Sequence, residues 1–352
     1  MSTTASLRVF VAVIAGAAGT APLSTAAPPK RDYTEVELRT GDGATLAGRY
    51  WPGRMGPKSP AVIVLDDVGP GAKAARCDAV ARELARAGCA VLCFDFRGHS
   101  GSTAVTAEFW ADPTNRRLVR RGRSKEAIAA TDFKAGYLPQ LVNDVAAARA
   151  YLLRRNDAGE CNAGQTIVVG FGRGAAIGAL WVATEWARYR LIDEFPERLR
   201  DLPEGTDVAG CVWVAPDPRA DGRTLPMLDW IRRAGQNQGV IQAWIYDRAD
   251  TVAAGLAARC AAELNRGGDK LSVVREMTRD GARPITDDPA LAGNVGRAVK
   301  FIREEREAPE WDDRDFADSR YLWQYRGWRT VAAKAAEERD FAPVYLDPFR
   351  GR

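Results

Sequence analysis

The clearest chemical signal in the sequence is a glycine-rich turn, Gly170-Phe171-Gly172-Arg173-Gly174. It follows an apolar run at 167–169 that favours a buried strand, and it precedes an alanine-rich stretch that favours a helix. A strand-to-helix turn of the form G-x-S-x-G is a known way of exposing a nucleophilic serine. The nucleophile position is Gly172 here, and glycine has no side-chain atom that could attack a carbonyl carbon. The turn therefore predicts the backbone of a catalytic site without its nucleophile.

A general base is missing as well. His99 is the only histidine among the 352 residues, and it follows Arg97-Gly98 far upstream of the glycine turn. An arginine stays protonated, so Arg283 cannot replace an imidazole. Because nothing in the sequence places a nucleophile beside His99, we expect this histidine to form hydrogen bonds within its own turn.

The glycine turn has two further interpretations. The N-terminus of a helix presents free N–H groups that suit an anion, and Arg173 would add a charged contact. Alternatively, Gly170, Gly172 and Gly174 only permit a tight turn and close packing of helix on strand. The turn also fits a loose dinucleotide fingerprint, G-x-G-x-x-A, but it follows the third core strand and lacks the acidic partner that such a site requires. We therefore expect no nucleotide and no other cofactor.

Several aspartates follow the ends of predicted strands, where they would gather at one edge of a sheet. A site for a hard cation is one interpretation, and capping of turns and helices is the other. No fixed spacing of ligands appears, and neither C-x-x-C nor paired histidines occur, so we predict no metal site. These aspartates are Asp66, Asp67, Asp95, Asp217, Asp247 and Asp250.

The elements that would position these residues alternate along the chain. Alternating residues at 33–39 and 44–51 predict an antiparallel hairpin. Apolar runs predict buried strands at 60–65, 89–94, 166–169, 209–214, 239–246 and 271–274. Helical patterns separate most of them, at 81–85, 141–153, 175–183, 253–264 and 295–302. This order predicts an α/β fold with a mostly parallel sheet, a leading antiparallel hairpin and helices on both faces.

Over residues 33–304 the chain resembles the α/β-hydrolase superfamily, near its dienelactone-hydrolase-like and serine-aminopeptidase-like members. The matching pieces, in order, are the hairpin, the loop after Leu65, the segment 94–102, Asp144, the glycine turn and the segment 246–250. The resemblance implies that Asp250 occupies the position of the triad acid, whereas the nucleophile and base positions have lost their residues. It also makes five residues candidates for ligand binding: Asp67, Val68, Gly172, Arg173 and Asp250.

The chain ends differ from this domain. Residues 1–27 have the layout of a secretory signal peptide, with Arg8 before an apolar run, so we expect a secreted or periplasmic protein. An uncleaved N-terminal membrane anchor is the alternative; after signal removal we expect no stable membrane span. The domain would occupy 28–305, with 103–137 and 216–237 as lid insertions. Residues 306–352 form an aromatic-rich extension that includes a predicted helix at 330–339, and it either packs on its own domain or offers a surface to a protein partner.

The composition of the chain indicates which classes of binding partner to expect. The net charge of +4 is small for a chain of this length. Residues 116–125 are rich in basic side chains but contain no aromatic residue that could stack on bases, so we expect no binding of nucleic acid. Export makes the six cysteines candidates for disulfides, although several fall at inward strand positions and favour buried thiols. The hypothesis from sequence is a non-catalytic protein, a pseudoenzyme, with a cleft for a small acidic ligand or a protein partner. The alternative is an active hydrolase with an unusual or metal-assisted set of catalytic groups.

Overall fold

The computed structural model describes residues 31–69, 75–120, 125–134, 136–194, 197–199, 201–220, 222–235, 239–265, 272–277, 288–317, 319–323 and 331–332. The chain divides at Arg31, and every element below belongs to the unit Asp32–Arg352. The expected signal peptide, residues 1–27, lies outside the described residues. Within these ranges, no helix has both the length and the apolar character that crossing a membrane would require.

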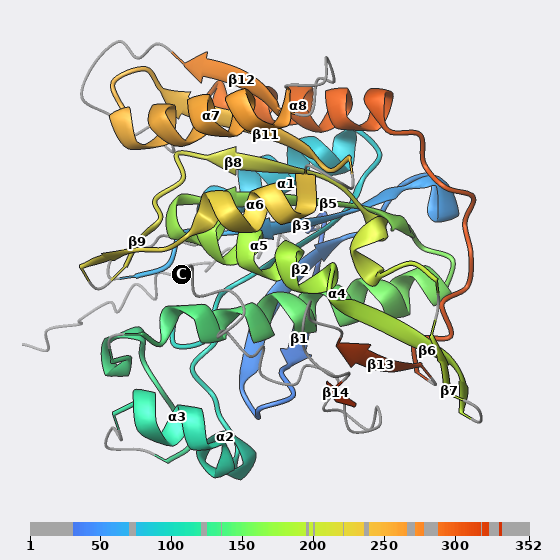
Figure 1. Cartoon of the computed structure of the whole chain (residues 1–352). Coiled ribbons are helices and arrows are strands. Elements are labelled where there is room, and N and C mark those ends of the chain that lie inside the picture. Colours follow the sequence, from blue (N-terminus) through green and yellow to red (C-terminus); the bar gives the residue numbers. More distant parts are fainter. Residues whose placement is uncertain are drawn as a thin grey trace, which may run out of the picture. The chain divides into compact units, whose positions relative to one another are not determined.

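The unit is built on a mixed, eight-stranded sheet (Figure 1). The strand order is β1-β2-β4-β3-β5-β8-β11-β12. The β1–β2 and β2–β4 pairs are antiparallel, and all other neighbours are parallel. The strands are β1 (Thr34–Arg39), β2 (Thr45–Trp51), β3 (Pro60–Leu65), β4 (Ala90–Phe94), β5 (Asn162–Phe171), β8 (Val208–Val214), β11 (Ile241–Asp247) and β12 (Ser272–Met277).

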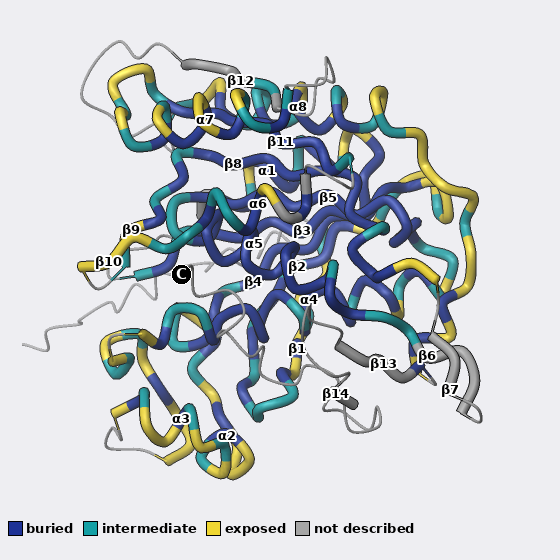
Figure 2. Tube along the Cα trace, viewed as in Figure 1, coloured by how far each residue is buried: buried dark blue, intermediate teal, exposed yellow. Residues whose placement is uncertain are grey.

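Helices cover both faces of the sheet, which explains why the central strands are apolar along their whole length. Val62 and Val64 of β3 face α1 (Ala75–Arg86) and α8 (Leu291–Glu305). Ile63 and Leu65 face the opposite layer, because successive side chains of a strand alternate between faces. That layer holds α4 (Val142–Asp157), α5 (Gly172–Glu185), α6 (Met227–Gly235) and α7 (Thr251–Leu264). The central strands β3, β4, β5, β8 and β11 are buried (Figure 2).

This sheet, with its antiparallel second strand and with helices on both faces, has the α/β-hydrolase fold, so the fold class expected from sequence is confirmed. The apolar runs at 60–65, 166–169 and 209–214 lie within strands, and those at 89–94, 239–246 and 271–274 overlap strands that begin one or two residues later. The hairpin matches β1 and β2 to within one residue.

The two segments expected to be lids have more structure than the sequence suggested. Residues 103–137 contain α2 (Ala107–Ala111), α3 (Pro113–Leu118) and a 3₁₀ turn, Ala130–Asp132. They are fastened to the β1–β2 turn by the bonds Thr45 N–H to Ala104 O and Thr106 N–H to Gly43 O, both 2.9 Å. Residues 216–237 contain the short strands β9 (Arg219–Ala220) and β10 (Arg223–Thr224), followed by α6. The helix α6 packs on α5 and α7, so it belongs to the core.

A second, smaller sheet was not foreseen. It has the order β14-β13-β6-β7 and joins β6 (Arg188–Glu194) and β7 (Glu197–Leu199) to β13 (Arg320–Trp323) and β14 (Val331–Ala332) of the extension. The predicted helix at 330–339 is wrong at its start, because Val331 and Ala332 pair with β13 as a strand. Residues 333–339 lie outside the described residues.

The six cysteines are all buried and none forms a disulfide bond, as the inward strand positions of several of them favoured. Burial raises the pKa of the Cys89 thiol to about 11 and that of the Cys161 thiol to about 12. A thiol with a raised pKa is a poor nucleophile at neutral pH. These two cysteines therefore do not replace the missing nucleophile.

Candidate functional site

The glycine turn connects β5 to α5 at the carboxyl edge of the sheet. Gly172 has φ +52°, a left-handed conformation that a residue with a Cβ adopts only under strain. Gly170 and Gly174 are required by close packing. A Cβ at Gly174 would lie 2.1 Å from the carbonyl oxygen of Asp66, and one at Gly170 would lie 2.6 Å from Cα of Ala175. The structure thus has the sharp strand-to-helix turn that exposes a nucleophile in this fold.

The place of the missing nucleophile is taken by the side chain of Asp67. A Cβ added to Gly172 would lie 2.5 Å from both Cγ and Oδ1 of this carboxylate. Oδ1 accepts hydrogen bonds from the backbone N–H groups of Val68 and Arg173, each at 2.9 Å. Gly172 and Asp67 therefore fit together because the first has no side chain.

The two N–H groups that hold Asp67 have a defined role in this fold. The N–H of the residue after the nucleophile, together with one from the loop after the third strand, forms the oxyanion hole of an α/β-hydrolase. By the resemblance, Arg173, which follows Gly172, and Val68, which lies in the loop after β3, correspond to these two donors. An oxyanion hole stabilises the negative oxygen of the tetrahedral intermediate in acyl transfer. In this chain its donors are already satisfied by a carboxylate of the chain itself.

The position of Asp67 is fixed by its neighbours along the chain. β3 ends at Leu65, and the buried Asp66 accepts a hydrogen bond from the N–H of Asp67 through Oδ1 at 2.8 Å. Arg173 is the second residue of α5, where the helix dipole favours a negative charge. The loop after β3 thus directs a carboxylate toward the N-terminus of α5.

Asp250, at the expected position of the triad acid, is the N-cap of α7. Its Oδ1 accepts hydrogen bonds from the N–H groups of Val252 and Ala253, at 3.1 and 3.0 Å. Both contacts stabilise the first turn of its own helix. The structure therefore gives Asp250 a role in the fold that needs no catalytic partner.

His99 forms hydrogen bonds through both ring nitrogens. The N–H of Gly69 donates to Nε2 at 3.0 Å, so Nδ1 carries the proton and donates to the carbonyl oxygen of Arg97, also at 3.0 Å. The imidazole links the loop after β3 to the loop after β4. This is the structural role expected from the sequence, and neither nitrogen is left to accept a proton from a nucleophile.

The strand-end aspartates have local hydrogen-bond partners. Among the residues that the structure describes, no group of three or more His, Cys, Asp or Glu side chains could hold a metal ion. Asp95 accepts from the N–H of Gly101 and Asp247 from the N–H of Ala249. Asp217 pairs with Arg219 at 2.8 Å. Burial raises the pKa of Asp217, but the hydrogen bonds with Arg219 outweigh this and leave the pKa below its usual value.

One group of polar residues near the site was missed by sequence reasoning. Arg97 is fully buried and binds Asp144 through Nε at 2.6 Å and Asp42 through Nη2 at 2.8 Å. Asn115 of α3 donates to Asp42 at 3.0 Å, and the hydroxyl of Tyr137 donates to Asn115 at 2.9 Å. This cluster joins the β1–β2 turn, the loop after β4, α3 and α4. Its only sequence signal was the match of Asp144 and of the segment 94–102 to the resembling family.

Comparison with known proteins finds solved structures of similar fold. No family model matches the chain, and no curated protein sequence is detectably similar to it. A putative α/β hydrolase of unknown function from Agrobacterium tumefaciens has 17% identity and a TM-score of 0.48, over 79% of this chain and 100% of that one. A dienelactone hydrolase from Anabaena variabilis has 15% identity and a TM-score of 0.48, over 78% and 99%. An esterase from Pyrococcus furiosus has 14% identity and a TM-score of 0.47, over 78% and 90%. At these values the likeness carries no information about activity.

Proposed function

We propose that the chain is a pseudoenzyme, an exported protein with the α/β-hydrolase fold that acts by binding and does not hydrolyse substrates. The observation that carries the proposal is the Asp67 carboxylate, which takes the place of the nucleophile and is bound by the N–H groups of Val68 and Arg173. Glycine cannot form an acyl bond, and the filled oxyanion hole would have to be emptied before it could stabilise an intermediate.

The binding surface that we propose surrounds the glycine turn. The N–H of Asp217 donates to the carbonyl oxygen of Gly172 at 2.9 Å, so the segment that begins at Pro216 borders the turn. A small acidic ligand would pair with the Arg173 guanidinium or displace Asp67 from the two backbone N–H groups. A protein partner that covers the same surface would be expected to use the same contacts.

Absence of catalysis is tested directly on the full chain. We expect no hydrolysis of p-nitrophenyl acetate or butyrate above the rate in buffer, and no covalent labelling by a fluorophosphonate probe. An enzyme-like rate that is lost in Asp250→Ala, or a labelled serine or cysteine near the turn, would contradict the proposal. Asp229→Ala, which removes a surface carboxylate of α6, is the matched control.

The filled oxyanion hole is tested by chemical rescue. In Asp67→Ala the N–H groups of Val68 and Arg173 lose their acceptor, so added acetate should bind there and raise the melting temperature. Wild type and Asp229→Ala should show no such rise, and sodium chloride of equal ionic strength controls for screening. An equal response of all three proteins to acetate would show that Asp67 does not occupy an anion site.

Export is tested by the position of the mature N-terminus. We expect the protein outside the cytoplasm, beginning near residue 28, because residues 1–27 have a signal-peptide pattern. N-terminal sequencing or the intact mass of the native protein shows where the chain begins. A membrane-bound chain that begins at Met1 would support the uncleaved anchor instead.

A second candidate function follows from the same observation. Carboxylates act as nucleophiles in some hydrolases, and the carboxylate of Asp67 lies where a nucleophile would be. Attack of Asp67 on a p-nitrophenyl ester would release p-nitrophenolate and leave the acyl group on Asp67 as a mixed anhydride, which water would then cleave. Activity that disappears in Asp67→Asn, with acylated Asp67 detected by mass spectrometry after acid quench, would favour this hydrolase over the pseudoenzyme.

A further inference from the structure

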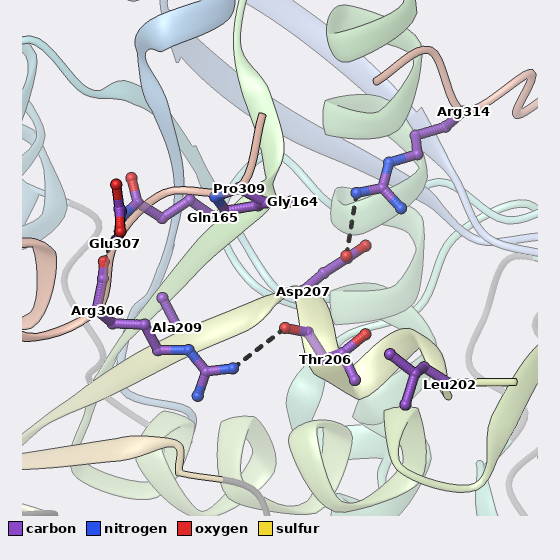
Figure 3. A pocket seen from close by; sticks show the side chains of 10 residues that line it. All are labelled: Gly164, Gln165, Leu202, Thr206, Asp207, Ala209, Arg306, Glu307, Pro309 and Arg314. Carbon is purple, nitrogen blue, oxygen red and sulfur yellow. Dashed lines mark hydrogen bonds and ion pairs between the residues drawn. The ribbon is translucent and has the colours of Figure 1, made fainter. Parts of the chain in front are cut away.

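A cavity lined in part by charged side chains lies at the edge of the sheet opposite to the glycine turn. It has a volume of about 290 Å³ and is open to solvent (Figure 3). Gly164 and Gln165 contribute to it from the start of β5, whereas Gly172 follows the end of the same strand. The six residues from Thr166 to Gly172 alone separate the two places by roughly 20 Å. The cavity is lined by Gly164, Gln165, Leu202, Thr206, Asp207, Ala209, Arg306, Glu307, Pro309 and Arg314.

The wall of the cavity includes the first part of the C-terminal extension, which is fixed to the domain. Asn162 donates to the carbonyl oxygen of Pro309 at 2.9 Å, and Gln165 donates to that of Arg306 at 3.0 Å. The carboxylate of Asp157, at the end of α4, accepts from the N–H groups of Arg314 and Phe316, each at 2.9 Å. The cavity is therefore formed by ordered residues in a defined geometry.

Arg314 is the most informative residue of this cavity, because it is only 5% exposed. Its Nη2 donates to Oδ1 of Asp207 at 3.1 Å. Its Nε and Nη1 are buried and have no hydrogen-bond partner among the described residues. Buried donors without an acceptor cost free energy, and such groups in a cavity mark a place for an acceptor to bind.

The charge of Asp207 is already balanced by a second arginine. Arg149 donates to Oδ2 of Asp207 at 2.7 Å, so two guanidinium groups share one carboxylate. Of these three side chains, two are cationic and one is anionic.

Arg306 brings a further guanidinium group from another side, as Figure 3 shows. Its Nη2 lies 3.5 Å from the carbonyl oxygen of Thr206. Burial lowers the pKa of Arg306, but an arginine remains charged at neutral pH. Glu307 is the only other charged residue in the lining, and its side chain is exposed. The cavity thus offers guanidinium hydrogen-bond donors from two sides.

We propose that this cavity binds an oxyanion, the phosphoryl or carboxylate group of a small molecule, between Arg306 and Arg314. Guanidinium groups bind both of these groups through paired hydrogen bonds. The volume lies at the lower end of the range for ligand sites, which fits a small metabolite. The site is separate from the glycine turn, so this proposal does not depend on whether the protein is a pseudoenzyme.

Titration of the full protein tests this inference. We expect saturable binding, by isothermal titration calorimetry, of inorganic phosphate or of a small dicarboxylate such as succinate. Binding of phosphate alone identifies a phosphoryl ligand, and binding of succinate alone identifies a carboxylate; either result supports the site. If neither anion binds saturably at an ionic strength matched with sodium chloride, the inference is overturned.

Variants assign the binding to this cavity. Arg306→Gln should weaken binding about tenfold or more, since it removes one of two charged contacts. Arg314→Lys keeps the charge near Asp207 but removes the forked donor, and it should also weaken binding. Arg297→Gln on the surface of α8 is the matched control and should leave the affinity unchanged. Equal affinities of wild type, Arg306→Gln and Arg297→Gln would place the anion elsewhere and contradict the inference.

Discussion

At the scale of single residues, the glycine turn and Asp67 form one unit. A side chain at position 172 and the Asp67 carboxylate occupy the same volume, so they exclude each other. From sequence, the loss of the nucleophile was evident, and Asp67, Val68 and Arg173 were candidates for binding a ligand. That Asp67 itself binds to the other two could not be predicted, because it depends on how the loop after β3 meets α5 in space.

This exclusion predicts a coupling between two substitutions. Gly172→Ser should destabilise the protein by about 1–3 kcal/mol, because it combines a left-handed backbone with displacement of Asp67. Asp67→Gly should cost about 1.5–3 kcal/mol through the loss of two bonds to a charged acceptor. In the double variant the serine has room, so the total cost should be smaller than the sum. Denaturant unfolding of all four proteins measures this coupling, and strictly additive costs would mean that the two sites do not interact.

A second prediction at this scale concerns pH. Burial, and then the charge of Asp207, raise the pKa of Glu204 in the folded protein. A raised carboxyl pKa gives stability that is present below the unfolded pKa and is lost as pH rises through the folded pKa. Glu204→Gln should therefore gain stability relative to wild type as pH increases from about 4 to 8. Melting temperatures across this range check the trend; a difference that stays constant with pH would contradict it.

At the scale of elements, the cluster around Arg97 determines how the insertion 103–137 is attached. Arg97 is buried with Asp42 and Asp144, and hydrogen bonds through Asn115 and Tyr137 extend the cluster to α3. The main strands were predictable because continuous apolar runs are typical of strands buried on both faces. β6 and β7 were not predictable, since their residues are largely polar, and β13 was not predictable because it is only four residues long and pairs with β6, far away in sequence.

Removing the arginine should therefore loosen the insertion as well as the core. Arg97→Met leaves two buried carboxylates without their partner and should cost about 3–5 kcal/mol. Hydrogen exchange should increase in α3 and around Tyr137 before it increases in the central strands. Arg39→Met, at an exposed position of β1, serves as the control and should change stability little. Unaltered exchange in α3 would show that the cluster does not hold the insertion.

At the scale of the whole domain, the described part of the C-terminal extension connects three places on the fold. It follows α8, lines the cavity at the amino edge of the sheet, and pairs through β13 with β6. From its aromatic composition we expected either packing on the domain or a surface for a protein partner, and Trp311 and Phe316 do contact the domain. Trp311 donates to the carbonyl oxygen of Asn156 at 3.2 Å, and Phe316 lies under the guanidinium group of Arg154. The backbone contacts with Asp157 carried no sequence signal, because a single aspartate at a helix end is common.

Substitution of Asp157 should change both the stability of the extension and the affinity for the anion. Asp157→Ala removes the acceptor of the Arg314 and Phe316 N–H groups, which should cost about 1.5–3 kcal/mol locally. Hydrogen exchange should rise at 312–319, and phosphate or succinate should bind more weakly because Arg314 is no longer positioned. Asp229→Ala, a surface substitution on α6, should change neither property. Faster exchange with unchanged anion affinity would contradict this prediction. It would show that Arg314 reaches its place in the cavity without the backbone contacts of the extension.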